Sequence, residues 1–205
     1  MKVVGIIGSK RATGNTATLV TSALDEIKRH GIETEVVYLG EMSISGCTGC
    51  EGCAKTMECT IDDDMQKVYP LIREADALIV GSPTYFYDVT SDMKAFIDRC
   101  YSLVMFDAGD RSCWVGAGNL RSPQPLLGVV TVCEQSDVSN IRFTADVIQL
   151  GLESVGYRTI GVVKAPNLFR QGEASEDGGA LDEARRLGAR IATTLRLQEQ
   201  ASLLV

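Results

Sequence analysis

Short apolar runs alternate with stretches of helical spacing along the chain. Near-continuous apolar runs of this length are typical of parallel strands buried on both faces. We expect strands at 2–9, 33–39, 76–82, 126–133 and 159–165. Between them, apolar residues recur every three to four positions, which predicts helices near 19–27, 65–72, 93–104, 141–155 and 181–195. Alternating strands and helices predict an α/β fold with a doubly wound, five-stranded parallel sheet in three layers.

Two segments lack any clear period and are expected as loops. One is a cysteine-rich loop at about 43–64, and the other is a long loop at about 105–125 that contains several glycines and prolines. No repeat, low-complexity tract or linker interrupts the sequence. We therefore expect a single domain over residues 1–205.

Composition narrows the classes of partner. The chain of 205 residues has a formal net charge of −7, which argues against nucleic acid or an anionic membrane, since both select clustered Lys and Arg. No apolar run approaches the roughly 20 residues of a membrane span, and the short run at the start does not resemble a signal peptide. We expect a cytoplasmic protein with reduced thiols.

The loop after the first strand has the chemistry of a phosphate site. It opens a helix, whose backbone N–H groups and dipole favour an anion. Glycine permits close approach of the backbone, and the neighbouring side chains add hydroxyl, amide and guanidinium donors. The candidates are Ser9, Arg11, Thr13, Gly14, Asn15 and Thr16. A capped helix start with no ligand is the plain structural alternative.

The third strand ends in an aromatic segment that is expected at the same edge of the sheet. Ligands in such sheets bind beyond the carboxyl ends of the strands. Proline fixes the direction of the chain, and the aromatic rings that follow offer flat faces to a ring system. The candidates are Ser82, Pro83, Thr84, Tyr85 and Phe86.

The cysteine-rich loop predicts a metal centre. Cys47, Cys50, Cys53 and Cys59 follow a C-x2-C-x2-C-x5-C spacing, and four closely spaced thiolates suit an iron–sulfur cluster of the cubic type. A zinc site, free thiols and disulfides remain as alternatives. Five acidic residues around the cysteines are expected to lower the potential of such a cluster: Glu51, Glu58, Asp62, Asp63 and Asp64. The alternative is that the Asp run only caps the helix at Met65.

Together these segments resemble the iron–sulfur flavoproteins, in the NAD(P)H-dependent FMN reductase branch of the flavodoxin-like fold. The motifs are G-S-K-R-A-T-G-N-T at 8–16, the cysteine run at 47–59, A-D-A-L-I-V-G-S-P-T-Y at 75–85 and M-K-A-F-I-D-R at 93–99. The resemblance implies FMN with its phosphate on the first loop and its ring near 83–86, and a [4Fe–4S] cluster on the four cysteines. It also implies a homodimer or homotetramer in which neighbouring subunits exchange electrons.

The expected function is an FMN-dependent oxidoreductase that relays electrons between FMN and the cluster, with NAD(P)H as a candidate donor. FMN handles electrons in pairs or singly, whereas a cluster passes one at a time. Two alternatives remain: an NAD(P)H-dependent FMN or quinone reductase without a cluster, and a non-enzymatic electron carrier of the flavodoxin type. No catalytic proton-transfer triad is visible in the sequence.

Overall fold

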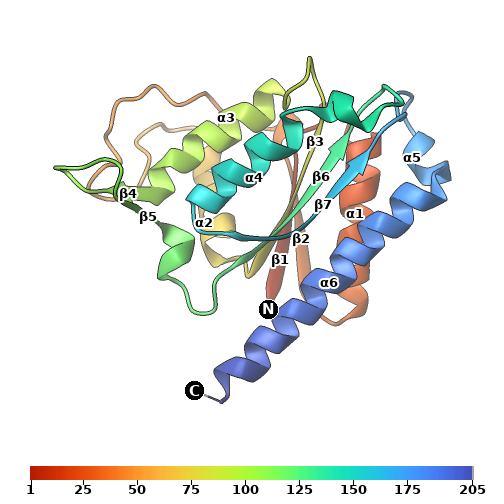
Figure 1. Cartoon of the computed structure of the whole chain (residues 1–205). Coiled ribbons are helices and arrows are strands. Elements are labelled where there is room, and N and C mark those ends of the chain that lie inside the picture. Colours follow the sequence, from red (N-terminus) through yellow and green to blue (C-terminus); the bar gives the residue numbers. More distant parts are fainter. Residues whose placement is uncertain (205) are drawn as a thin grey trace.

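The computed structural model describes residues 1–204 as a three-layer α/β sandwich around a five-stranded parallel sheet (Figure 1). The strand order is β2-β1-β3-β6-β7, with every neighbouring pair parallel. The strands are β1 (Lys2–Ile7), β2 (Glu33–Tyr38), β3 (Ala77–Pro83), β6 (Leu126–Val132) and β7 (Arg158–Ala165). The predicted flavodoxin-like sheet is confirmed.

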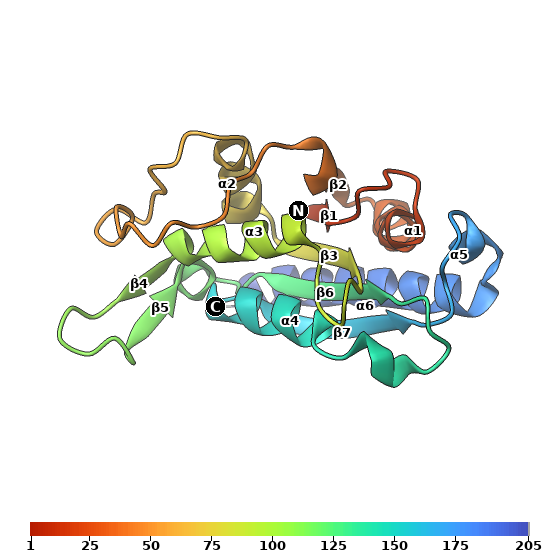
Figure 2. The same ribbon diagram turned by 90° about the horizontal axis from the view of Figure 1, so that it is seen from above.

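Helices cover both faces of the sheet (Figures 1 and 2). On one face, α1 (Asn15–Arg29) packs with α6 (Gly178–Ser202), and the four-residue α5 (Glu173–Glu176) lies beside them. On the other face lie α2 (Met65–Glu74), α3 (Ser91–Arg99) and α4 (Thr144–Ser154). Each face therefore has its own apolar core. None of the helices in residues 1–204 combines the length and apolarity that crossing a bilayer demands.

The segment expected as a long loop at about 105–125 carries regular structure, so this prediction needs correction. It contains an antiparallel hairpin of β4 (Val104–Phe106) and β5 (Trp114–Gly116), followed by a 3₁₀ turn over Ala117–Leu120. The helix expected over 93–104 is α-helical to Arg99 and continues as a 3₁₀ turn over Cys100–Leu103. Strands of three residues are too short to show a period of two, which is why the hydrophobic pattern did not reveal them.

The packing of α6 on α1 depends on a glycine. A Cβ atom placed on Gly188 would lie 2.3 Å from the carbonyl oxygen of Ala23, which belongs to the backbone of α1. Backbone atoms cannot yield as a flexible side chain does, so this contact holds the two helices close together. At the start of the same helix, Gly178 has no heavy atom within 4 Å of such a Cβ position.

We expect Gly188→Ala to lower the free energy of unfolding by about 1–3 kcal/mol, because the added methyl group forces α6 away from α1. Gly178→Ala is the matched control, with an expected change within about 0.5 kcal/mol. Urea denaturation of both variants measures the difference. Equal stability of the two variants would show that the helices tolerate a wider separation.

Candidate functional site

The loop after β1 folds tightly onto the start of α1. The Ser9 hydroxyl accepts a hydrogen bond from the N–H of Arg11 at 3.1 Å, and the N–H of Gly14 donates to the carbonyl of Arg11 at 2.9 Å. Gly14 precedes the first residue of α1, and the first turn of that helix carries no acidic side chain. The helix start therefore keeps its partial positive charge and its free N–H donors for an anion.

A pocket of about 420 Å³ lies at this edge of the sheet, and we call it the sheet-edge pocket. Of the eleven residues predicted to bind a cofactor, nine line it: Ser9, Arg11, Gly14, Asn15, Thr16, Pro83, Thr84, Tyr85 and Phe86. Four further lining residues were not predicted: Val132, Glu134, Leu168 and Phe169. The carboxyl ends of β1, β3 and β6 thus supply one cavity, as expected for parallel strands.

The two other candidates lie outside the lining. Thr13 faces away from the pocket and its hydroxyl accepts a hydrogen bond from the side chain of Gln171. Ser82 is fully buried, where its hydroxyl accepts from the N–H of Thr90 at 3.2 Å and donates to the carbonyl of Pro83 at 2.9 Å. Ser82 therefore fixes the turn that leads to α3.

The segment 168–174 closes one side of the sheet-edge pocket. Arg11 donates to the carbonyl of Phe169 at 3.2 Å. Asn15 donates to the carbonyl of Arg170 at 2.9 Å and accepts from the N–H of Ala174 at 3.1 Å. The Asn15 amide thus shapes the wall by binding backbone. More than 150 residues separate the partners, and no local pattern in the sequence encodes such a contact.

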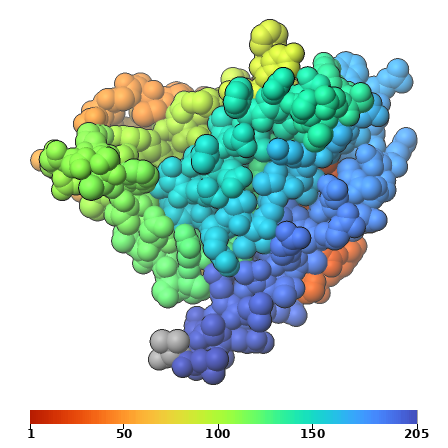
Figure 3. All heavy atoms as spheres, viewed as in Figure 1, coloured from red at the N-terminus to blue at the C-terminus, as the bar shows by residue number. Residues whose placement is uncertain are grey.

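The aromatic segment after β3 forms a tight turn that projects from the edge of the sheet (Figures 1 and 3). Tyr85 and Asp88 exchange backbone hydrogen bonds of 2.8 and 3.1 Å. Between them, Phe86 and Tyr87 adopt left-handed backbone angles, with φ of 51° and 69°. Such angles cost bulky residues roughly 1–2 kcal/mol each, and strain of this kind gathers at functional sites. The Phe86 side chain is 99% exposed and lines the pocket with an open ring face.

The four clustered cysteines lie together in a second, smaller pocket, which we call the cysteine pocket. Cys47, Cys50, Cys53 and Cys59 all line it, with Arg99 at the end of α3 and Tyr101 and Ser102 in the turn that follows. Within the described residues every cysteine is a free thiol. Residues 1–204 contain no group of three or more His, Cys, Asp or Glu side chains arranged to hold one metal ion.

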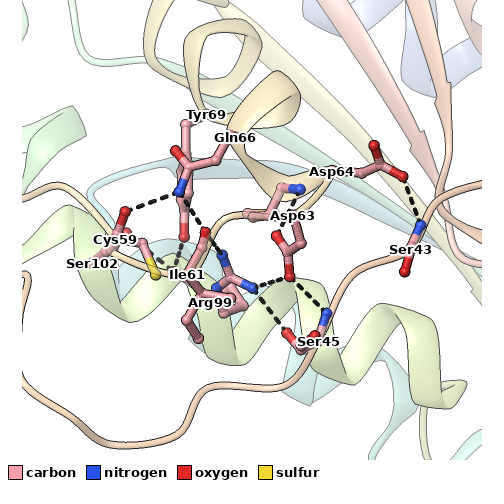
Figure 4. A network of polar contacts seen from close by, with 11 residues as sticks. Ser43, Ser45, Cys59, Ile61, Asp63, Asp64, Gln66, Tyr69, Arg99 and Ser102 are labelled. Carbon is pink, nitrogen blue, oxygen red and sulfur yellow. Dashed lines mark hydrogen bonds and ion pairs between the residues drawn. The ribbon is translucent and has the colours of Figure 1, made fainter.

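A buried arginine fastens both ends of the cysteine segment (Figure 4). Arg99 is 1% exposed and pairs with Asp63 at 2.6 Å. The same guanidinium donates to the carbonyl of Ser45 at 3.0 Å and of Ile61 at 3.3 Å. Asp63 in turn accepts from the N–H of Ser45 at 2.9 Å. The hydrophobic pattern of the sequence gives no sign that Arg99 is buried.

Arg99 and Asp63 each stabilise the charged form of the other. Burial disfavours ionised Asp63, but hydrogen bonds from Arg99 and from the N–H groups of Ser45 and Met65 hold the pKa of Asp63 below its ordinary value. Burial likewise disfavours charged Arg99, yet Asp63, Tyr69 and Cys59 together raise the pKa of Arg99. The Asp63 carboxylate also accepts from the N–H of Met65 at 3.0 Å. One residue of the acidic run therefore binds the first N–H of α2, whereas Asp64, directly before the helix, makes no side-chain cap hydrogen bond.

The thiols differ in their surroundings. Hydrogen bonds from the backbone of Gly52 and from Thr60 lower the pKa of Cys50, whereas burial raises the pKa of Cys53. Outside the cysteine pocket, burial raises the pKa of Cys100 to about 12. Cys133 is buried at the end of β6 and donates to the side chain of Gln135 at 3.1 Å. Cys113 is exposed on the hairpin.

Comparison with known proteins assigns the chain to a family. The NADPH-dependent FMN reductase family matches residues 1–116. Over 200 residues the chain is 34% identical to an iron–sulfur flavoprotein of Methanocaldococcus jannaschii, covering 96% of this chain and 98% of that protein. The chain belongs to the iron–sulfur flavoproteins of the FMN reductase family. An iron–sulfur flavoprotein of Archaeoglobus fulgidus is 44% identical over 99 residues, which are 48% of this chain and 45% of that protein.

Solved structures agree on the fold. An FMN-dependent NADH-azoreductase of Bacillus anthracis, in complex with FMN, superposes with a TM-score of 0.68 at 12% identity, over 94% of this chain and 100% of that one. A flavodoxin from the domain Archaea gives a TM-score of 0.59 at 14% identity, over 96% and 99%. Family membership makes the chain a flavin-dependent oxidoreductase that uses FMN.

We expect Arg99→Gln to lower the free energy of unfolding by about 3–5 kcal/mol, because it leaves the Asp63 carboxylate buried without its partner. Lys94→Gln on the same helix is the control. Its partner Asp98 lies 2.5 Å away but the pair is half-exposed, so the expected loss is below about 1 kcal/mol. Urea denaturation compares the two. Similar losses of unfolding free energy in both variants would show that the Arg99–Asp63 pair contributes no more than a surface ion pair.

Proposed function

We propose that the chain relays electrons between FMN in the sheet-edge pocket and a [4Fe–4S] cluster on Cys47, Cys50, Cys53 and Cys59. The observation that carries the proposal is the presence of two separate sites in one chain. One is a pocket at the carboxyl ends of the strands, and the other gathers four free thiols in one place. NAD(P)H is the proposed electron donor, in keeping with the family.

The sheet-edge pocket supports FMN by its chemistry. The N-terminus of α1 with Ser9, Arg11 and Thr16 would hold the phosphate, because it offers free N–H donors, hydroxyls and a fixed positive charge. The turn from Pro83 to Phe86 would face the isoalloxazine ring with flat, partly exposed side chains. When bound, FMN supplies hydride acceptance and single-electron release, and the protein supplies position and polarity.

The cysteine pocket supports a cluster by its donor set and by one unsatisfied group. Four thiols suit iron–sulfur ligation, in which each cysteine binds a different iron, so the four need not meet at a single ion. The Nε atom of buried Arg99 has no hydrogen-bond partner among the described residues, and Arg99 lines this pocket. A buried donor without a partner is costly, and a thiolate or sulfide of the cluster would satisfy it.

Loading the cluster requires the segment to widen. The cysteine pocket holds about 20 Å³, which is room for roughly one water molecule. Cys47 and Cys50 are exposed, so their sulfurs are free to move outward. Arg99 meanwhile fixes the ends of the segment at Ser45 and Ile61. We therefore assign Arg99 the role of a positioning residue that presents the thiols to the cluster.

We also infer that copies of the chain assemble around the flavin. The rim of the sheet-edge pocket carries exposed aromatic side chains: Tyr85, Phe86, Tyr87 and Phe169. An exposed aromatic group of this kind favours a protein surface that covers it. This supports the homo-oligomer, in which the cluster of one subunit serves the flavin of its neighbour.

For the cluster, we expect anaerobically purified protein to contain about four iron and four sulfide per chain. Cys59→Ala should lose most of both, because it removes one of the four ligands. Cys113→Ala is the control, since this exposed thiol lies on the hairpin and does not line the cysteine pocket. Iron and sulfide analysis against flavin absorbance makes the test. Flavin without iron in the unaltered protein would instead support a simple FMN reductase.

For FMN, we expect Arg11→Ala to raise the dissociation constant about tenfold or more, through loss of a charge-assisted contact with the phosphate. Lys10→Ala provides the neighbouring control, because Lys10 pairs with Asp92 at 2.8 Å and does not line the pocket. Titration of apoprotein with FMN, followed by flavin fluorescence, gives both constants. A larger effect at Lys10 than at Arg11 would place the phosphate elsewhere.

A further inference from the structure

A third and larger cavity lies beside the cysteine segment, and we call it the hairpin pocket. Its volume is about 630 Å³, within the range of small-molecule sites. Four parts of the chain surround it: the tip of the cysteine segment, the end of α3, the β4–β5 hairpin and the end of α4. Figures 1 and 2 both show the hairpin projecting beside the cysteine segment. The functions discussed above do not use this cavity.

One wall of the hairpin pocket is a row of aromatic rings. Tyr101 and Phe106 stack with centroids 5.3 Å apart and planes inclined by 27°. Trp114 continues the row, with its centroid 6.5 Å from that of Phe106, and remains 54% exposed. Aliphatic side chains complete the lining, including Ile97 and Val155. Such a wall favours a flat aromatic molecule, because ring stacking adds to the gain from apolar burial.

Charged groups at the opening of the hairpin pocket determine which flat aromatic molecules it favours. The Arg111 guanidinium lies 4.8 Å from the centroid of the Phe106 ring and 3.6 Å from the carboxylate of Glu51. It also donates a hydrogen bond to the hydroxyl of Tyr101. Glu51 holds a left-handed backbone angle, with φ of 55°. Arginine and tyrosine are suited to donate to a carbonyl oxygen, while Glu51 and Asp98 disfavour a strongly anionic ligand.

The hairpin pocket and the cysteine pocket share residues. Cys47, Gly49 and Glu51 line both of them. A molecule seated against the aromatic row would therefore contact the same chain segment that carries the proposed cluster ligands. We propose that the hairpin pocket binds a neutral, planar quinone of one or two fused rings, as an electron acceptor distinct from any ligand of the sheet-edge pocket. The binding site stands on its own geometry, whereas reduction of the quinone rests on the proposed function.

The overall reaction balances with the proposed donor. NAD(P)H gives up a hydride, and the quinone takes two electrons and two protons, one proton coming from solvent: NAD(P)H + H⁺ + quinone → NAD(P)⁺ + hydroquinone. Arg111 would stabilise the negative charge that develops on the quinone oxygen before it is protonated. This role requires Arg111 to exchange its contact with Tyr101 or Glu51 for one with the ligand.

Trp114 provides a direct test, since it is the single tryptophan of the chain and lines the hairpin pocket. The probe is 2,3-dimethyl-1,4-naphthoquinone, whose substituted ring carbons resist addition by the exposed thiols, titrated into purified protein that retains its cofactors. We expect saturable quenching of tryptophan fluorescence with an unchanged lifetime, as for a static complex. Arg111→Ala and Phe106→Ala should each raise the dissociation constant about tenfold, equivalent to about 1.4 kcal/mol.

The control is Phe143→Ala, because Phe143 is 63% exposed and lines neither the hairpin pocket nor the sheet-edge pocket. Its constant should match that of the unaltered protein. Linear quenching with a shortened lifetime would overturn the proposal, as would equal constants in all variants. Quenching that weakens as protein concentration rises would also overturn it, because a second copy of the chain would then cover the pocket.

The two proposals fail separately. Static quenching in anaerobically purified protein that lacks iron would support the quinone site and contradict the cluster. About four iron and four sulfide per chain, with no static quenching, would support the cluster and contradict the quinone site.

Discussion

The buried ion pair between Arg99 and Asp63 is the interaction on which the redox half of this structure depends. Two charges removed from water are costly unless their hydrogen bonds are also satisfied. Here Ser45, Ile61 and Met65 supply backbone partners, and Arg99 Nε is the one polar atom of the pair left without a partner among the described residues. The pair thereby ties an irregular, largely exposed segment to a rigid helix. Other contacts support the same segment: the Gln66 side chain donates to the carbonyls of Cys59 and Ile61 at 2.9 and 2.7 Å, and Asp64 accepts from the N–H of Ser43 at 2.8 Å.

Helix α3 connects the two proposed cofactor sites. Before its first residue, Thr90 donates its hydroxyl to the carbonyl of Gly8 at 2.5 Å and accepts from the N–H of Met93, which holds the helix beside the loop after β1. Its last residue is Arg99, at the cysteine pocket. Nine helical residues rise roughly 13 Å. The helix thus links the loop that lines the sheet-edge pocket to the cysteine pocket, although its own residues line only the latter.

The sequence predicts those features that depend on interactions between residues close together in the chain, and it misses those that depend on distant partners. The strands, the loop after β1 and the cysteine spacing are encoded by short stretches of sequence. Gly14 and Pro83, for example, constrain the backbone within a few positions of themselves. The burial of Arg99 depends on Asp63, 36 residues away. The wall built by Phe169 depends on Arg11, 158 residues away. The hairpin strands are stabilised by stacking of Phe106 on Tyr101. The hydrophobic period of the sequence does not predict this contact.

Pairing also alters what the acidic residues imply for a cluster. Counted along the sequence, five acidic residues would place negative charge around it and disfavour an added electron: Glu51, Glu58, Asp62, Asp63 and Asp64. In the structure, Asp63 is paired with Arg99, Asp64 with Lys67 at 2.6 Å and Glu51 with Arg111 at 3.6 Å. Only the Arg99 pair is buried, so it is the least screened by solvent. The local field at the cysteine pocket is therefore closer to neutral than the composition of the segment indicates, and a donor at Arg99 Nε would raise the cluster potential further.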